Sequence, residues 1–270
     1  MAEITKEELR SAIIRSGGPL YAVGFDLTEL ALPDVGWLQH ANLSGATLTR
    51  ANLTGANLTK CNLSGAELAH ANLSHSNLSS ADLSTASLQH ANLTKANLPG
   101  GDLEGANFAQ ANLTGADLTG ADLSHANLTG ANLSYANLWS ANLTGADLAG
   151  ADLSHANLSG ADLSHVNLAG ANLGSSTASQ ANLTGANLWN ANLAQANLTG
   201  ADLSVANLSS ADLTGADLSH SRMDSANLTN ATLPKARPTP ERRPTDPPPV
   251  APPGAQPPAA NLTLATRPKR

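Results

Sequence analysis

The residues best suited to chemistry are eight histidines, and each stands at a position that is a multiple of five. They are His40, His70, His75, His90, His125, His155, His165 and His220. Imidazole groups bind metal ions and transfer protons near neutral pH, but a metal or catalytic site needs several such groups at one point. Which histidines could meet depends on the element that imposes the five-residue step.

Cys61 is the only cysteine of the chain, which excludes an intramolecular disulfide and a four-ligand zinc site within one chain. The N-terminal residues are partly acidic and lack the apolar run of about 7–15 residues that marks a secretory signal. No stretch approaches the roughly 18 consecutive apolar residues that a membrane-spanning helix needs. We therefore expect a cytoplasmic protein with no membrane association.

The step of five comes from an unbroken repeat over residues 41–233. Counting from Leu43 to Leu233 in fives gives 39 central positions, of which 36 are Leu, and the residue two before the centre is Ala in 33 of them. The residue directly before the centre is Asn 23 times and Asp 10 times. The unit reads Ala-(Asn/Asp)-Leu-x-x, and it shows no insertion or deletion.

This unit predicts a short extended segment followed by a turn. The Ala and Leu side chains are two residues apart and point to one face, while the Asn or Asp between them points to the other. The Ser, Thr and Gly residues that follow favour a corner. Repeated corners wind the chain into a solenoid that is lined with Leu and Ala inside and polar outside. A Leu-filled interior leaves no concave pocket, so we expect no enzyme, no cofactor and no catalytic residue.

The pattern resembles the pentapeptide-repeat family. In that family four units form one square, right-handed coil, so the resemblance implies an all-β fold: a right-handed quadrilateral β-helix of about ten coils. At the strand spacing of roughly 4.8 Å, these coils would stack into a long rod. With 20 residues in each coil, His70 and His90 would stack at one corner without a third ligand, which makes the histidines exposed corner residues.

The two ends differ in sequence. Residues 1–24 predict a helix, capped by Thr5 and Glu8 in a capping box, and a cap on the solenoid. Residues 25–40 resemble a degenerate first coil, with Phe25, Leu30 and Val35 at the inner positions, Trp37 as a centre, and one extra residue before the main frame. Residues 234–270 contain 12 of the 15 prolines, which predicts a disordered, basic tail.

The acidic residues of the repeat are concentrated on one of the four expected sides. Residues 36–233 carry 13 acids and four bases. A 20-residue coil places seven of the acids on one side, and these are the candidate binding residues: Asp82, Asp102, Glu104, Asp122, Asp162, Asp202 and Asp224. The alternative is that Asn and Asp exchange freely on a solvated face.

Three functions are compatible with this pattern. The first is a non-enzymatic protein–protein interaction scaffold with one acidic face and an unknown protein partner. The second follows from the resemblance, since some pentapeptide-repeat proteins mimic DNA and modulate type II topoisomerases such as DNA gyrase, protecting them from inhibitors or toxins. The third, ice binding through Ser and Thr ladders, is disfavoured by their irregular mixture. The acidic rod itself is not expected to bind nucleic acid directly, and its open C-terminal coil predicts a homodimer.

One unit departs from the pattern. Ala178 stands where Leu is expected and Ser176 where Ala is expected. Because Leu-to-Ala changes in packed cores cost about 2–5 kcal/mol, the sequence predicts a kink or a local opening at this coil.

Overall fold

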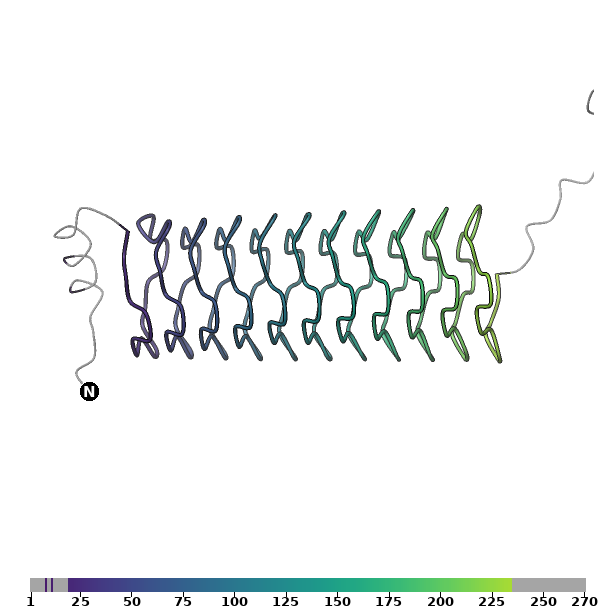
Figure 1. Ribbon diagram of the computed structural model, residues 1–270, viewed down its shortest axis with the longest axis horizontal. Helices are drawn as coiled ribbons and strands as arrows, with labels where there is room; N and C mark the ends of the chain where they lie inside the picture. Colours follow the sequence, from purple (N-terminus) through teal and green to yellow (C-terminus); the bar gives the residue numbers. More distant parts are fainter. Residues whose placement is uncertain (1–7, 9–10, 12–18, 235–270) are drawn as a thin grey trace, which may run out of the picture. The chain divides into compact units, whose positions relative to one another are not determined.

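The computed structural model describes residues 8, 11 and 19–234. From residue 20 onward the chain winds into stacked coils (Figure 1), and each repeat unit forms one side of a coil. Ten complete coils extend from residue 20 to residue 220, and residues 221–234 begin an eleventh. The described residues contain no multi-residue strand, because each unit contributes a single bridge residue to a parallel ladder. The expectation of about ten coils is confirmed.

Backbone hydrogen bonds between residues about one coil apart hold the stack together. On one side, the Leu43 amide donates to the carbonyl of Asn62 at 2.7 Å, and the Asn62 amide donates back to the carbonyl of Ala41 at 2.8 Å. The same pair of bonds recurs every five residues, so the coils are joined on all four sides. We name these sides by their bridge residues: the first contains residues 42, 62, 82 and so on to 222, and the second, third and fourth follow it by 5, 10 and 15 residues.

The interior is a continuous aliphatic column. Every central Leu from Leu43 to Leu213 is at most 1 % exposed, and every Ala that stands two residues before one of these centres is equally buried. Because each fully buried Leu side chain contributes about 1.5–3 kcal/mol, this column is the principal source of stability.

Every unit turns its corner with a left-handed residue at its last position. The backbone φ there is between 53° and 70° in all units from Gly24 to Asn230, with Gly in 16 of them and other residue types in 26. All eight histidines occupy such corners and are exposed. Their multiple-of-five numbering is therefore a property of the corner.

The first coil begins earlier than residue 25 and has a different length from the others. Tyr21 already bridges to Asn42, and the first-coil bridges span 21 residues where later ones span 20. The extra residue lies inside the fourth unit, so that Leu38 is the buried centre and Trp37 is only partly buried. The prediction that Trp37 is a central residue is therefore wrong. Phe25, expected inside, is 46 % exposed; it belongs to the first described coil, which has a described neighbouring coil on one side only.

The N-terminal helix falls almost entirely outside the described residues. Glu8 and Ser11 are described and are helical, and the rest of the helix stays a prediction. The tail over residues 235–270 also lies outside them.

The coil that contains Ala178 shows no local opening. The Leu158 amide donates to the Thr177 carbonyl at 2.6 Å, and the Ala178 amide donates to the Asn197 carbonyl at 2.7 Å. Thr177 bridges to both neighbouring coils, and Ala178 is 1 % exposed. The predicted opening is wrong, because the backbone hydrogen bonds to both neighbouring coils remain in place around the smaller inner side chain of Ala178.

Candidate functional site

The first side of the solenoid carries the acidic residues singled out from the sequence, and we call it the acidic side. Asp82, Asp102 and Asp122 are consecutive bridge partners, so their side chains project from neighbouring coils. Asp162 and Asp202 continue the same column above Asn142 and Asn182. Glu104 and Asp224 lie two residues after a bridge residue, in the turns of this side. The structure therefore brings all seven residues onto one side.

A local turn holds each bridge carboxylate in place. The Asp82 Oδ1 atom accepts hydrogen bonds from the amide of Ser84 at 3.0 Å and from its hydroxyl at 2.6 Å. In the next coil, Asp102 Oδ1 accepts a hydrogen bond from the backbone amide of Glu104 at 3.1 Å. Such Asx turns suit Asn and Asp equally, since both provide the accepting oxygen. This is why these two residue types dominate the bridge position.

Asn and Asp differ in what they offer to the neighbouring coil. An Asn has an amide that can donate to the residue below it, and Asn142 donates to Asp122 at 3.0 Å while Asn182 donates to Asp162 at 3.1 Å. Asp82 and Asp102 are followed one coil later by another carboxylate, which has no hydrogen to donate when ionised. Two ionised carboxylates at the coil spacing of roughly 4.8 Å repel by about 0.9 kcal/mol even at the dielectric constant of water. We call Asp82, Asp102 and Asp122 the carboxylate stack.

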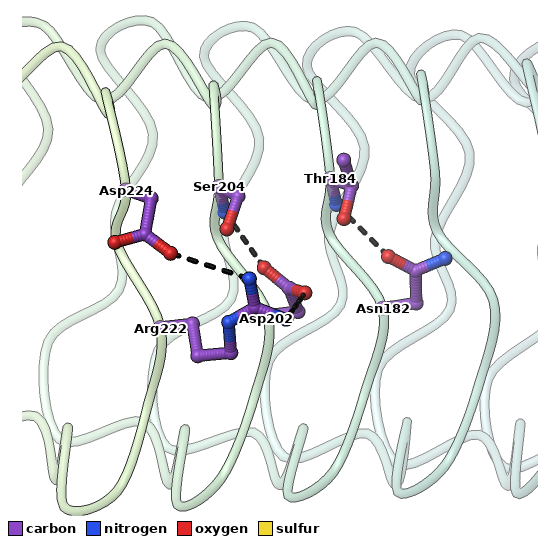
Figure 2. A network of polar contacts seen from close by, with 6 residues as sticks. All are labelled: Asn182, Thr184, Asp202, Ser204, Arg222 and Asp224. Atoms are coloured by element: carbon purple, nitrogen blue, oxygen red, sulfur yellow. Dashed lines mark hydrogen bonds and ion pairs between the residues drawn. The ribbon is translucent and has the colours of Figure 1, made fainter.

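The C-terminal end of the acidic side is partly neutralised by one basic residue. Arg222 occupies the bridge position above Asp202, and Figure 2 shows its guanidinium between two carboxylates. It lies 3.2 Å from an oxygen of Asp202 and 3.2 Å from one of Asp224. The other five acidic residues of this side, which are the carboxylate stack with Glu104 and Asp162, form no ion pair among the described residues. The 20-residue spacing between positions 202 and 222 would have revealed this pairing in the sequence.

The second side illustrates the opposite arrangement. Asn167, Asn187, Asn207 and Asn227 each donate an amide hydrogen to the bridge residue one coil earlier, at 2.9, 3.0, 3.2 and 3.2 Å. We call this column, which begins at Asp147, the amide ladder. Its side-chain hydrogen bonds are satisfied within the protein, so it has less need of an external partner than the carboxylate stack.

The histidines are exposed at the corners, whereas Cys61 is buried in the core. His70 and His90 stack as expected, with ring centroids 4.9 Å apart, and Tyr135 stacks on His155 at 4.8 Å. No group of three potential metal ligands occurs within the described part of the chain. Burial raises the pKa of the Cys61 thiol to about 12, and a thiol rather than a thiolate is a poor nucleophile.

Two tryptophans are among the large apolar residues exposed on the surface. Trp139 is 53 % exposed and Trp189 is 52 % exposed. They follow bridge residues of the fourth and second sides respectively, and therefore do not belong to the acidic side. Among the described residues there is no helix long and apolar enough to cross a membrane.

Comparisons with known proteins agree with this architecture. A family profile described as pentapeptide repeats matches eight copies in segments between residues 37 and 237. The crystal structure of HetL, a pentapeptide repeat protein involved in heterocyst differentiation regulation from Nostoc sp. strain PCC 7120, is 33 % identical over 86 % of this chain and 98 % of its own, with a TM-score of 0.38. No curated protein sequence matches the chain.

Two further structures are similar over smaller shares or at lower identity. A trypsin-treated variant of QnrB1, a plasmid-mediated fluoroquinolone resistance protein, is 22 % identical over 76 % of this chain and 90 % of its own, with a TM-score of 0.46. A pentapeptide repeat protein from the Arabidopsis thaliana thylakoid lumen is 39 % identical over 37 % of this chain and 67 % of its own, with a TM-score of 0.24. The family profile spans most of the chain, so this chain belongs to the pentapeptide-repeat family and is a right-handed quadrilateral β-helix.

Proposed function

We propose that this protein is a non-enzymatic scaffold that binds another protein through its acidic side. The observation that carries the proposal is the carboxylate stack, in which three Asp side chains follow one another on a rigid backbone. Asn would keep the same turns without the repulsion between neighbours, and it does so at most bridge positions. A partner with a row of Lys or Arg side chains would relieve this repulsion, and charge complementarity would speed and orient its binding.

An exchange of carboxylates for amides tests the surface without disturbing the fold. The test variant combines Asp82→Asn, Asp102→Asn and Asp122→Asn. Its matched control combines Asp117→Asn, Asp147→Asn and Asp152→Asn, which removes the same charge from other sides. We expect partners captured from the source cell extract by the unaltered protein to be retained by the control and lost by the test variant. Equal capture by all three proteins would contradict the proposal.

A second candidate function is modulation of a type II topoisomerase such as DNA gyrase by mimicry of DNA. Family resemblance suggests it, and the regular column of carboxylates on the acidic side favours it. The described repeat is less charged than DNA, however: residues 36–233 carry a net −9, whereas duplex DNA carries one charge per roughly 1.7 Å. Titration of the protein into a gyrase supercoiling assay, with and without a fluoroquinolone, tests this function. Unchanged supercoiling and unchanged drug sensitivity at micromolar protein would remove it.

We also propose a cytoplasmic location and a homodimer formed through the last coil. The dimer is supported by the apolar residues left uncovered there, since Leu233 is 52 % exposed and Leu218, Met223 and Leu228 are only partly buried. Light scattering coupled to size-exclusion chromatography tests it, and a mass equal to one chain at all concentrations would contradict it. Cell fractionation tests the location.

A further inference from the structure

One unit of the solenoid combines a small central residue with an inner hydroxyl group. Ala178 takes the place of the central Leu, and Ser176 takes the place of the Ala two residues earlier. Both residues are buried, with Ser176 2 % exposed and Ala178 1 % exposed. Ser176 Oγ makes no hydrogen bond with any residue that the structure describes. Because a buried hydroxyl without a partner costs about 1–3 kcal/mol, a further hydrogen-bonding group at this position would stabilise the fold.

The two other units with an inner Ser bind its hydroxyl group to their own backbone. Ser76 Oγ donates to the Leu73 carbonyl at 2.6 Å, and Ser221 Oγ donates to the Leu218 carbonyl at 2.7 Å. The central residue is Leu in the first of these units and Met in the second. The hydroxyl group of an inner Ser is therefore without its carbonyl partner in the one unit whose central residue is Ala.

The backbone around Ala178 keeps its hydrogen bonds to the neighbouring coils at their ordinary length. The Ala178 amide donates to the Asn197 carbonyl at 2.7 Å, and the Leu158 amide donates to the Thr177 carbonyl at 2.6 Å, within the range of 2.6–2.8 Å that the same bonds have in the other units. The coil is therefore held in the common frame, although Ala lacks the isopropyl group of Leu. Val166, which stands where most units have Ala, adds methyl groups to the interior of the same coil. The space that remains suits only a small molecule.

Two backbone carbonyls of this part of the coil have the capacity for another hydrogen bond, since a carbonyl oxygen has two lone pairs. The Leu173 carbonyl accepts the Ser176 amide at 3.1 Å, and the equivalent carbonyls of the other two units accept a hydroxyl group as well. The Ala178 carbonyl accepts the Ala181 amide at 3.3 Å, whereas the equivalent bonds of the two adjoining coils measure 3.1 and 3.0 Å. Both oxygens can therefore accept from a further donor.

We propose that the space beside Ser176 and Ala178 is a binding site for one internal water molecule. The water would accept the hydrogen of the Ser176 hydroxyl and donate to the carbonyls of Leu173 and Ala178, which gives it the about three hydrogen bonds that are typical of a buried water. In this arrangement the water links the Ser176 hydroxyl to the carbonyl that an inner Ser reaches directly in the other two units. Ala178 alone would not make such a site, because a purely apolar cavity stays dry. The inference does not depend on the acidic side or on the proposed dimer.

Crystal structures of the unaltered protein and of three variants test the site. In the unaltered protein we expect electron density for a water at about 3 Å from Ser176 Oγ. Ala178→Leu restores the usual central residue, so it should remove the water and turn the Ser176 hydroxyl onto the Leu173 carbonyl. Ser176→Ala should also remove the water, because it deletes the polar side chain that the water binds. The matched control is Ser76→Ala, which deletes an inner hydroxyl that already has a carbonyl partner and should leave the water at Ser176 in place.

Three results would overturn this assignment. The first is an unaltered protein in which the Ser176 hydroxyl donates directly to the Leu173 carbonyl and no water lies beside it. The second is a water that is retained in Ala178→Leu or in Ser176→Ala, since its site would then not depend on both residues. The third is a water that is lost from the Ser76→Ala control as well, because any change in the core would then remove it.

Discussion

The carboxylate stack and the amide ladder are built on the same backbone, and they differ only in one side-chain atom at each bridge residue. In both, the side-chain oxygen of the bridge residue accepts a hydrogen bond from the backbone amide two residues later. Asp82 accepts it from Ser84 at 3.0 Å, and Asn207 accepts it from Ser209 at 3.2 Å. In the ladder, each Asn also donates to the coil below, whereas Asp102 and Asp122 cannot donate to their neighbours. The comparison teaches that the frame and the surface chemistry are separable in this fold. Conserving the oxygen preserves the turn, and exchanging the amide for a carboxylate adds charge.

The largest expected effect concerns what the two regions share. Leu103 lies beneath the carboxylate stack and Leu188 beneath the amide ladder, and both are fully buried. We expect Leu103→Ala and Leu188→Ala each to lower the free energy of unfolding by about 2–5 kcal/mol, as for other buried leucines. Chemical denaturation measures both values. A large difference between them would mean that the core, and not only the surface, distinguishes the two regions.

A smaller effect is expected when the stack is converted into a ladder. Asp102→Asn removes two carboxylate–carboxylate repulsions and adds a donor toward Asp82, so it should raise the free energy of unfolding by about 2–3 kcal/mol at low salt. Repeating the measurement at about 1 M salt, where the screening length falls to about 3 Å, should reduce the gain to the hydrogen-bond contribution. A destabilised variant would show that the stacked carboxylates do not repel.

The converse substitution introduces a carboxylate into the ladder. Asn187→Asp removes the 3.0 Å hydrogen bond to Asn167 but keeps an acceptor for Asn207. The expected loss is about 1 kcal/mol, the usual value of one net hydrogen bond. Thermal unfolding of both variants measures these changes, and we expect Asp102→Asn to raise the stability and Asn187→Asp to lower it. Changes of the same sign would contradict the distinction between the regions.

The smallest effect concerns a carboxylate outside both regions, Asp212, whose bridge neighbours Asn192 and Thr232 are uncharged. Hydrogen bonds from the hydroxyl and the amide of Thr214, at 2.6 and 2.9 Å, lower the pKa of Asp212. A lowered pKa in the folded state stabilises the fold above the ordinary Asp pKa, and this contribution is lost as pH falls through the folded pKa. We expect Thr214→Val to raise the Asp212 pKa in a carboxyl NMR titration, and an unchanged pKa would show that the hydroxyl contact does not form in solution.

The sequence predicts the repeated part of this molecule well, because its core, turns and bridge residues each depend on one position of a five-residue unit. Prediction fails where the unit is irregular. Trp37 and Leu38 are both apolar, and the sequence alone does not show which of them an extra residue places inside. Ala178 was expected to deform its coil because the cost of a lost side chain was considered without the hydrogen bonds that fix the backbone. The seven acidic residues were placed on one side correctly, but the pairing of Arg222 with two of them was missed.

The left-handed corners have a consequence for how such a protein can change over time. A left-handed residue other than Gly costs roughly 1–2 kcal/mol, yet 26 corners carry His, Gln, Lys, Ser, Tyr, Val or other side chains. These side chains point away from the column of leucines, so replacing one leaves every interior contact unchanged. Mutation to Gly at such a corner releases strain, and mutation away from Gly incurs it in a small and local amount. The corners therefore form a regular grid of sites at which natural variation or protein engineering can alter the surface while the inherited frame stays the same.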